Sequence, residues 1–123
     1  MRVGVDLVDV AAFRARFDGR DDLLAHTFSE TELAYCRAQP RPWAHLAARF
    51  AAREAALKAL GTGLGEAMSW RDVEVTRDPA GTPGLVFHGG VAEALKRAGF
   101  ERSIVSLSHT ATHAIAVVVL FGA

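Results

Sequence analysis

The stretch Leu46-Ala-Ala-Arg-Phe-Ala-Ala-Arg-Glu-Ala-Ala-Leu-Lys58 is the most informative part of this 123-residue chain. Around it, large apolar side chains recur with alanines between them, at Trp43, Leu46, Phe50, Leu57 and Leu60. This is the spacing of a buried stripe on one face of an α-helix. Pro42 suits the first turn of a helix, and Gly61 suits the position after the last turn. The sequence therefore predicts a long helix that begins at about Pro42 or Trp43 and ends at Leu60.

Shorter elements surround this helix. Residues 3–10 alternate and are rich in β-branched side chains, which is typical of a strand. Residues 11–17, residues 21–26 and the segment after the capping-box pattern Ser29-Glu-Thr-Glu32 are typical of short helices. Further along the chain we expect strands at 72–77, 85–87, 103–108 and 114–121, with a helix at 91–98. This order predicts a single α+β domain, residues 1–123, with a largely antiparallel sheet packed against the long helix and the shorter ones.

The composition excludes several classes of protein. Lys and Arg total 14, as do Asp and Glu, so the net charge is zero and a general nucleic-acid binder is not expected. The single cysteine, Cys36, allows no internal disulfide. The most apolar run, Ala114 to Phe121, is far shorter than the ~20 residues of a membrane helix, and the first residues do not resemble a signal peptide. We therefore expect a cytoplasmic protein without a membrane or nucleic-acid partner.

Two carboxylates stand at unusual positions. Glu54 falls on the apolar stripe of the long helix, between Phe50 and Leu57, although buried carboxylates are rare unless they are paired or bind a metal. A surface ion pair with Lys58, worth only about 0.2–0.5 kcal/mol, would explain it equally well. Asp6 lies inside the first strand, where aspartate is uncommon, unless the strand ends there and faces water.

Asp6 and Glu54 together are more informative than either carboxylate alone. Two carboxylates on two rigid elements suit Mg²⁺ when a phosphate substrate supplies further oxygen ligands. Lys58, one turn beyond Glu54, would then neutralise phosphate charge. His109 follows a strand and suits phosphate binding, although a polar hairpin loop explains it too. The segment Gly61-Thr-Gly63 lacks the order of a P-loop, and a helix cap followed by a turn accounts for it.

Taken in order along the chain, these pieces resemble the 4'-phosphopantetheinyl transferases, specifically the short holo-acyl-carrier-protein synthase type. The matching segments are Val3-Gly-Val-Asp-Leu-Val-Asp9, Phe28-Ser-Glu-Thr-Glu-Leu33, Leu46 to Lys58, Gly61-Thr-Gly63, Gly81-Thr-Pro83 and Val105-Ser-Leu-Ser-His-Thr110. The resemblance runs nearly from end to end. It implies the fold of that family and an enzyme that moves the phosphopantetheine arm of coenzyme A onto a serine of an apo acyl carrier protein, releasing adenosine 3',5'-bisphosphate.

The resemblance also implies roles for individual residues. Asp6 and Glu54 correspond to the metal carboxylates, with Mg²⁺ as the expected ion and Mn²⁺ as the alternative, and Lys58 corresponds to the phosphate-binding lysine. These three are the expected catalytic residues. The expected coenzyme A contacts are Arg49, Lys58, Gly61, Thr62, Gly63, Pro83, Ser108 and His109. Short members of the family are homotrimers with coenzyme A between neighbouring subunits, so we expect the same assembly.

Some alternatives stay open at this stage. The general base is either Glu54 or a metal-bound water, and the carrier belongs to fatty-acid or to secondary metabolism. Arg53 stands where the family usually has lysine, and Ala12 stands where its carrier-binding helix usually has arginine, although Arg14 and Arg16 are close. Two other functions remain: a non-catalytic coenzyme A- or carrier-binding module, and a metal-dependent phosphohydrolase.

Overall fold

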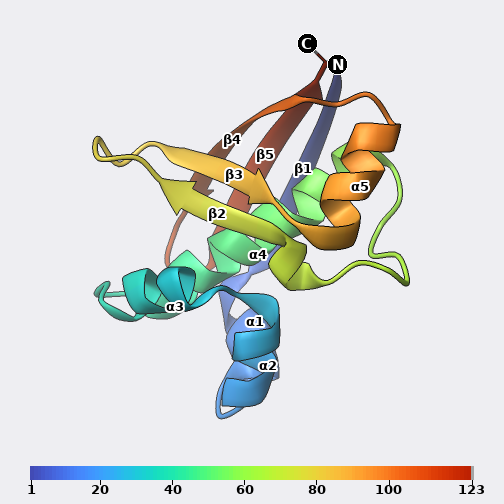
Figure 1. The fold of residues 1–123 in the computed structure, drawn as a ribbon. Helices are drawn as coiled ribbons and strands as arrows, with labels where there is room; N and C mark the ends of the chain where they lie inside the picture. Colours follow the sequence, from blue (N-terminus) through green and yellow to red (C-terminus); the bar gives the residue numbers. More distant parts are fainter. Residues whose placement is uncertain (123) are drawn as a thin grey trace.

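The computed structural model describes residues 1–122 (Figure 1). Its elements, in chain order, are β1 (Arg2–Asp9), α1 (Val10–Phe17), α2 (Asp21–Thr27), α3 (Glu30–Arg37), α4 (Pro42–Leu60), the 3-10 turn η1 (Trp70–Asp72), β2 (Val73–Arg77), β3 (Pro83–Phe87), α5 (Gly89–Arg97), β4 (Arg102–His109) and β5 (His113–Phe121). Each helix and strand expected from the sequence is present. The α+β fold class is thereby confirmed.

The strands form two sheets rather than the one that we expected. β1, β5 and β4 make a three-stranded antiparallel sheet with β5 in the middle, and β2 and β3 form a separate antiparallel hairpin. α4 lies between the two, packed against the three-stranded sheet on one side and against β2 on the other (Figure 1). The two ends of the chain lie side by side, because Arg2 pairs with Leu120 in the β1–β5 register.

Small side chains let α4 lie very close to β1. The alanines of α4 that face the sheet are at most 2% exposed, namely Ala51, Ala52, Ala55, Ala56 and Ala59. Opposite them, β1 carries Gly4, where an added Cβ would stand 1.9 Å from the carbonyl oxygen of Ala55. Only glycine fits such a close backbone approach. This packing fixes β1, and with it Asp6, against the middle of the long helix.

Local capping interactions set the ends of several helices. The Asp9 carboxylate accepts a hydrogen bond from the backbone N–H of Ala12 at the start of α1, and Ser29 with Glu32 forms the expected capping box of α3. Gly61 ends α4 in the left-handed region, at φ 90°.

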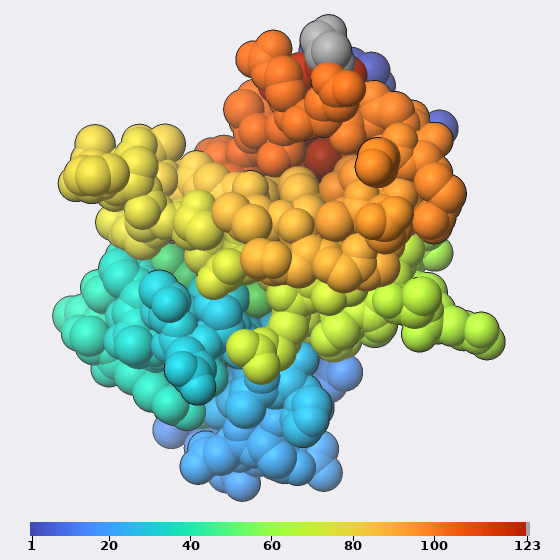
Figure 2. Space-filling view, viewed as in Figure 1, coloured from blue at the N-terminus to red at the C-terminus, as the bar shows by residue number. Residues whose placement is uncertain are grey.

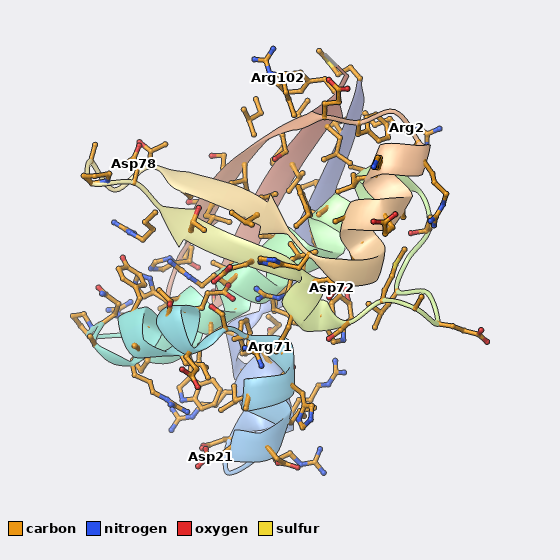
Figure 3. All side chains as sticks on the ribbon, in the orientation of Figure 1. Arg2, Asp21, Arg71, Asp72, Asp78 and Arg102 are labelled. Atoms are coloured by element: carbon orange, nitrogen blue, oxygen red, sulfur yellow. The ribbon has the colours of Figure 1, made fainter. Side chains whose placement is uncertain are left out.

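Asp72 was expected to begin a strand, but it lies in η1 at the foot of α5 (Figure 3). Its carboxylate accepts hydrogen bonds from the N–H groups of Ser69 and Val91, which explains why the strand begins one residue later.

A second apolar cluster fixes α1 against the first half of α4. The rings of Phe13, Phe17, Phe28 and Phe50 are buried and lie 4.5–6.3 Å from one another wherever two of them pack together. Aromatic pairs at these separations contribute more than their buried area alone. These aromatic side chains therefore form core, and they hold α1 beside the part of α4 that carries Phe50.

The surface has two projecting segments (Figure 2). One is the turn between β2 and β3, and the other is the loop that follows Gly61. No helix among residues 1–122 combines the length and the apolar character needed to cross a membrane.

Candidate functional site

Asp6 and Lys58 meet where β1 crosses α4. The ammonium group of Lys58 donates a hydrogen bond to Asp6 Oδ1 at 2.9 Å and another to the carbonyl oxygen of Val5 at 3.2 Å. The Asp6 side chain is 15% exposed, whereas that of Lys58 is 56% exposed. The ion pair therefore joins a sheltered carboxylate to an accessible cation. Lys58 therefore pairs with Asp6 and not with Glu54, the partner that the sequence also allowed.

Glu54 lies beside this pair, but not on the stripe where the sequence analysis put it. Arg53, one residue earlier, occupies the buried stripe and is 0% exposed. Glu54 is only partly buried, at the edge of the helix that faces Asp6. Burial raises the pKa of Glu54, the Asp6 carboxylate raises it further, and the cations Lys58 and Arg16 lower it. The carboxylates of Asp6 and Glu54 therefore repel each other.

This arrangement fits a divalent cation. Two carboxylates that repel each other are relieved by a shared positive charge, and Mg²⁺ commonly takes one or two protein carboxylates with water and substrate phosphates. A fuller protein cage is absent: residues 1–122 contain no group of three or more His, Cys, Asp or Glu side chains placed to hold a metal. The donor set is thus of the kind that leaves coordination positions for a phosphate substrate.

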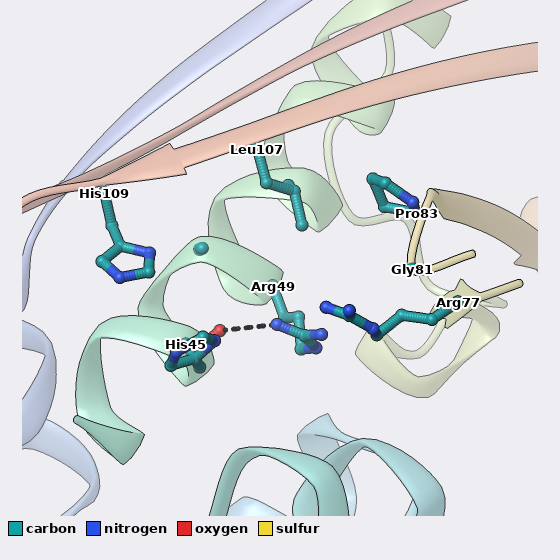
Figure 4. Close-up of a pocket in the computed structure, with 8 residues that line it drawn as sticks. His45, Arg49, Arg77, Gly81, Pro83, Leu107 and His109 are labelled. Carbon is teal, nitrogen blue, oxygen red and sulfur yellow. Dashed lines mark hydrogen bonds between the residues drawn. The ribbon is translucent and has the colours of Figure 1, made fainter. Parts of the chain in front are cut away.

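A second group of expected residues lines a cavity of about 220 Å³ on another side of α4. Arg49 from α4, Pro83 from β3 and His109 from the end of β4 all face it (Figure 4). The same cavity is lined by His45 and Arg77, which the sequence analysis did not select. Arg49 and Glu54 are five residues apart, so their side chains project about 140° apart around the helix. Within one chain, the cavity and the Asp6–Glu54 pair are therefore separate.

The remaining expected contacts lie outside this cavity. Gly61, Thr62 and Gly63 form the exposed loop after α4, one turn beyond Lys58, and the Thr62 hydroxyl donates to the carbonyl oxygen of Gly63. Ser108 lines a neighbouring hollow with His109 and Leu7. The structure thus gathers the expected residues into two groups, one around Lys58 and one around Arg49.

The structure also reveals a buried ion pair that sequence reasoning missed. The Arg53 guanidinium donates to both oxygens of the Glu32 carboxylate, at 2.9 and 2.5 Å, and to the carbonyl oxygen of Trp70. Glu32 also accepts a hydrogen bond from the N–H of Val75. The spacing 46, 50, 53, 57 and 60 would have placed Arg53 on the buried stripe, but its charge favoured a surface position. The pair and the Val75 hydrogen bond tie α3, α4 and β2 together.

Comparison with known proteins identifies the family. Residues 2–118 match the model of the 4'-phosphopantetheinyl transferase superfamily. The chain belongs to this superfamily. The transferase is 41% identical over 117 residues to a holo-acyl-carrier-protein synthase of Moorella thermoacetica, covering 95% of this chain and 91% of that protein. It is 43% identical over 118 residues to the synthase of Geobacter sulfurreducens, covering 95% and 94%.

Solved structures agree with this assignment. The transferase resembles the Helicobacter pylori holo-acyl-carrier-protein synthase in complex with coenzyme A, with a TM-score of 0.84 and 28% identity, over 97% of this chain and 99% of that one. It also resembles the Mycobacterium tuberculosis acyl carrier protein synthase, with a TM-score of 0.76 and 34% identity, over 99% and 97%. The family expected from the sequence is confirmed, and so is its enzymatic activity as a phosphopantetheinyl transferase.

Proposed function

We propose that this transferase uses Asp6, Glu54 and Lys58 to move the phosphopantetheine arm of coenzyme A onto a serine of an apo acyl carrier protein. The observation that carries the proposal is the cluster of these three side chains where β1 crosses α4. Coenzyme A is bound in the related Helicobacter pylori structure, and the curated relatives are holo-acyl-carrier-protein synthases. The donor and the acceptor follow from that relationship.

The chemistry is phosphoryl transfer, in which positioning and charge neutralisation dominate. The hydroxyl oxygen of the carrier serine attacks the phosphorus that bears the pantetheine. A new oxygen–phosphorus bond forms, and the bond from that phosphorus to the bridging pyrophosphate oxygen breaks. Adenosine 3',5'-bisphosphate leaves with the electron pair. The serine proton passes to the Glu54 carboxylate or to a water molecule beside it.

Asp6 and Glu54 would hold the divalent cation, with Mg²⁺ expected and Mn²⁺ as the alternative. When bound, the cation neutralises charge on the pyrophosphate. Lys58 then turns from Asp6 toward the leaving phosphate, which its exposed position allows. Its present hydrogen bond to Asp6 raises the pKa of Lys58, so the side chain stays cationic throughout the physiological range.

We propose that the working unit is a homotrimer. The outer face of the three-stranded sheet exposes apolar side chains, namely Val3, Val5, Leu7, Ile104, Ile115 and Val117, and contiguous patches of this kind mark protein interfaces. The two groups of expected site residues also lie on different sides of α4. A coenzyme A held between neighbouring copies would contact the carboxylates of one copy and the Arg49 cavity of the next.

The carrier protein would dock on α1. Arg14 and Arg16 are on this helix, and Arg16 lies close enough to Glu54 to lower the pKa of its carboxyl. A basic helix beside the reaction centre suits an acidic recognition helix on the partner.

The single cysteine, Cys36, is buried and free, which suits the reducing cytoplasm that we propose as the site of action.

Intact-protein mass spectrometry of an apo carrier incubated with the transferase, coenzyme A and Mg²⁺ tests this function. We expect the carrier to gain the mass of one phosphopantetheine, and we expect excess chelator or the Glu54→Ala change to prevent it. Coenzyme A binding without any mass gain on several carriers would favour a non-catalytic binding module. Release of phosphate without a carrier would favour a phosphohydrolase.

A further inference from the structure

The cavity beside Arg49 collects four potentially cationic groups. Arg49 and His45 come from α4, Arg77 from β2 and His109 from β4, and all line the same 220 Å³ hollow (Figure 4). The guanidinium carbons of Arg49 and Arg77 stand 4.7 and 4.4 Å from the ring centroid of Tyr35. One aromatic ring from α3 thus holds both guanidiniums. Among the described residues that line the cavity there is no carboxylate.

Arg49 brings an unsatisfied hydrogen-bond donor to the wall of this cavity. The side chain is 4% exposed, and its Nε is a buried nitrogen that lacks a hydrogen-bond partner within residues 1–122. Its Nη1 donates only to the carbonyl oxygen of His45, at 3.3 Å. An unsatisfied buried donor on a charged group costs free energy unless a ligand or water completes it. An anion would accept a hydrogen bond from this donor and would also offset the repulsion among the neighbouring positive charges.

His45 lies beside His109, on the side of the cavity away from Arg77 (Figure 4). Its ring centroid is 4.8 Å from that of His109 on β4 and 5.9 Å from that of Tyr35 on α3. The other charged groups that face it are Arg49 on its own helix and Arg77 on β2. Burial lowers the pKa of His45, and His109, Arg49 and Arg77 lower it further. An anion bound among these groups would reverse that electrostatic influence and favour the protonated imidazole.

We infer that His45 and Arg77 form a specificity-determining pair that recognises a phosphomonoester dianion in this cavity, with His45 taking up a proton as the anion binds. The inference rests on the proposed function for the identity of that anion, which is the 3'-phosphate of coenzyme A. Arg49 and His109 were already expected to contact coenzyme A. His45 and Arg77 complete a four-sided cationic enclosure around the same phosphate, and Tyr35 positions the two guanidiniums.

Coenzyme A and dephospho-coenzyme A give a direct test, because they differ only in this phosphate. The affinities of the wild type, His45→Gln and Arg77→Gln for both compounds would be measured by titration calorimetry at pH 6.0 and pH 7.5. Each pH would be studied in two buffers with different ionisation enthalpies. We expect either change to weaken coenzyme A binding about tenfold, the usual effect of losing one charge-assisted hydrogen bond. Dephospho-coenzyme A binding should be nearly unchanged.

Proton uptake separates His45 from Arg77. Binding of the dianion releases protons from the phosphate at pH 6.0, so the readout is the difference from the wild type: His45→Gln should lower the net number of protons taken up when coenzyme A binds, whereas Arg77→Gln should not. His88→Gln is the matched control, because His88 is half-exposed and pairs with Glu74 away from the cavity. Equal losses for both compounds, or undiminished uptake in His45→Gln, would overturn the inference. Wild-type transfer to the carrier, measured in parallel, tests the proposed function independently of these binding differences.

Discussion

The buried pair between Arg53 and Glu32 permits a quantitative prediction about stability. Arg53→Met keeps an unbranched apolar stem in the same space but removes the guanidinium. The change deletes the two hydrogen bonds to Glu32, one to the carbonyl oxygen of Trp70 and one to that of Arg49. It also removes the contact of the guanidinium with the ring of Phe28, whose centroid is 4.7 Å away. Glu32, which is 2% exposed, then keeps only backbone donors.

The expected cost follows from this geometry. Removing one partner of a buried ion pair typically destabilises a protein by about 3–5 kcal/mol, because the other charge stays uncompensated. Domains of this size are stable by about 5–15 kcal/mol, and each kcal/mol shifts the melting temperature by about 4 °C. We therefore expect Arg53→Met to lower the melting temperature by about 12–20 °C. The melting temperature of Arg53→Lys should fall between those of Arg53→Met and the wild type, since an ammonium cannot reproduce the bidentate contact.

Urea unfolding of four proteins tests this reasoning: the wild type, Arg53→Met, Glu32→Met and the double variant. Replacing both partners removes the uncompensated charge, so the double variant should be more stable than Arg53→Met alone. It should remain about 1 kcal/mol below the wild type, because Glu32 also caps α3. A loss below about 1 kcal/mol for Arg53→Met, or a double variant whose loss equals the sum of the two single losses, would refute the argument.

Three further predictions concern the reaction centre and its partner. Gly4→Ala should lower the free energy of unfolding in urea by about 3 kcal/mol and reduce transfer. The new Cβ would lie 1.9 Å from the Ala55 carbonyl oxygen and push β1 off α4. A variant as stable as the wild type would contradict this packing. Glu54→Gln should abolish transfer yet modestly raise the free energy of unfolding at pH 7 in chelator. The folded-state pKa of Glu54 lies above its ordinary value of 4.5, so ionising this side chain disfavours folding as the pH rises above 4.5. The difference in stability between Glu54→Gln and the wild type should therefore vanish when thermal unfolding is followed down to about pH 4. Arg14→Glu should raise the carrier KM about tenfold while the KM for coenzyme A stays constant, since a rim charge acts mainly on association; an unchanged carrier KM would place the docking face elsewhere.

Local signals explain why the helices and strands could be predicted. The Ser29 capping box and the Gly61 terminus depend on residues within a few positions of each other, and both are present as expected. The long helix was visible because its apolar side chains follow the helical period. The resemblance to the family assigned Asp6 and Lys58 to one site, and these two side chains do meet.

Features that depend on distant segments could not be predicted in the same way. Periodicity gives no strand partners, so the split into a three-stranded sheet and a hairpin was not foreseen. The burial of Arg53 depends on a carboxylate 21 residues away, and charge alone argues for a surface position. His45 and Arg77 meet only because the β2–β3 hairpin folds across α4. Such placements arise from tertiary packing, which overrides local preference.

The order of strands in the sheet has a consequence for synthesis of the protein. β1 carries Asp6 at the sheet edge, and its one neighbouring strand is β5, residues 113–121. Until β5 has emerged from the ribosome, β1 lacks a strand to pair with, and Asp6 has no fixed position beside Glu54. The nascent chain therefore acquires the proposed reaction centre only after residues 113–121 have been translated. A product that ends before residue 113 should therefore be inert rather than partly active.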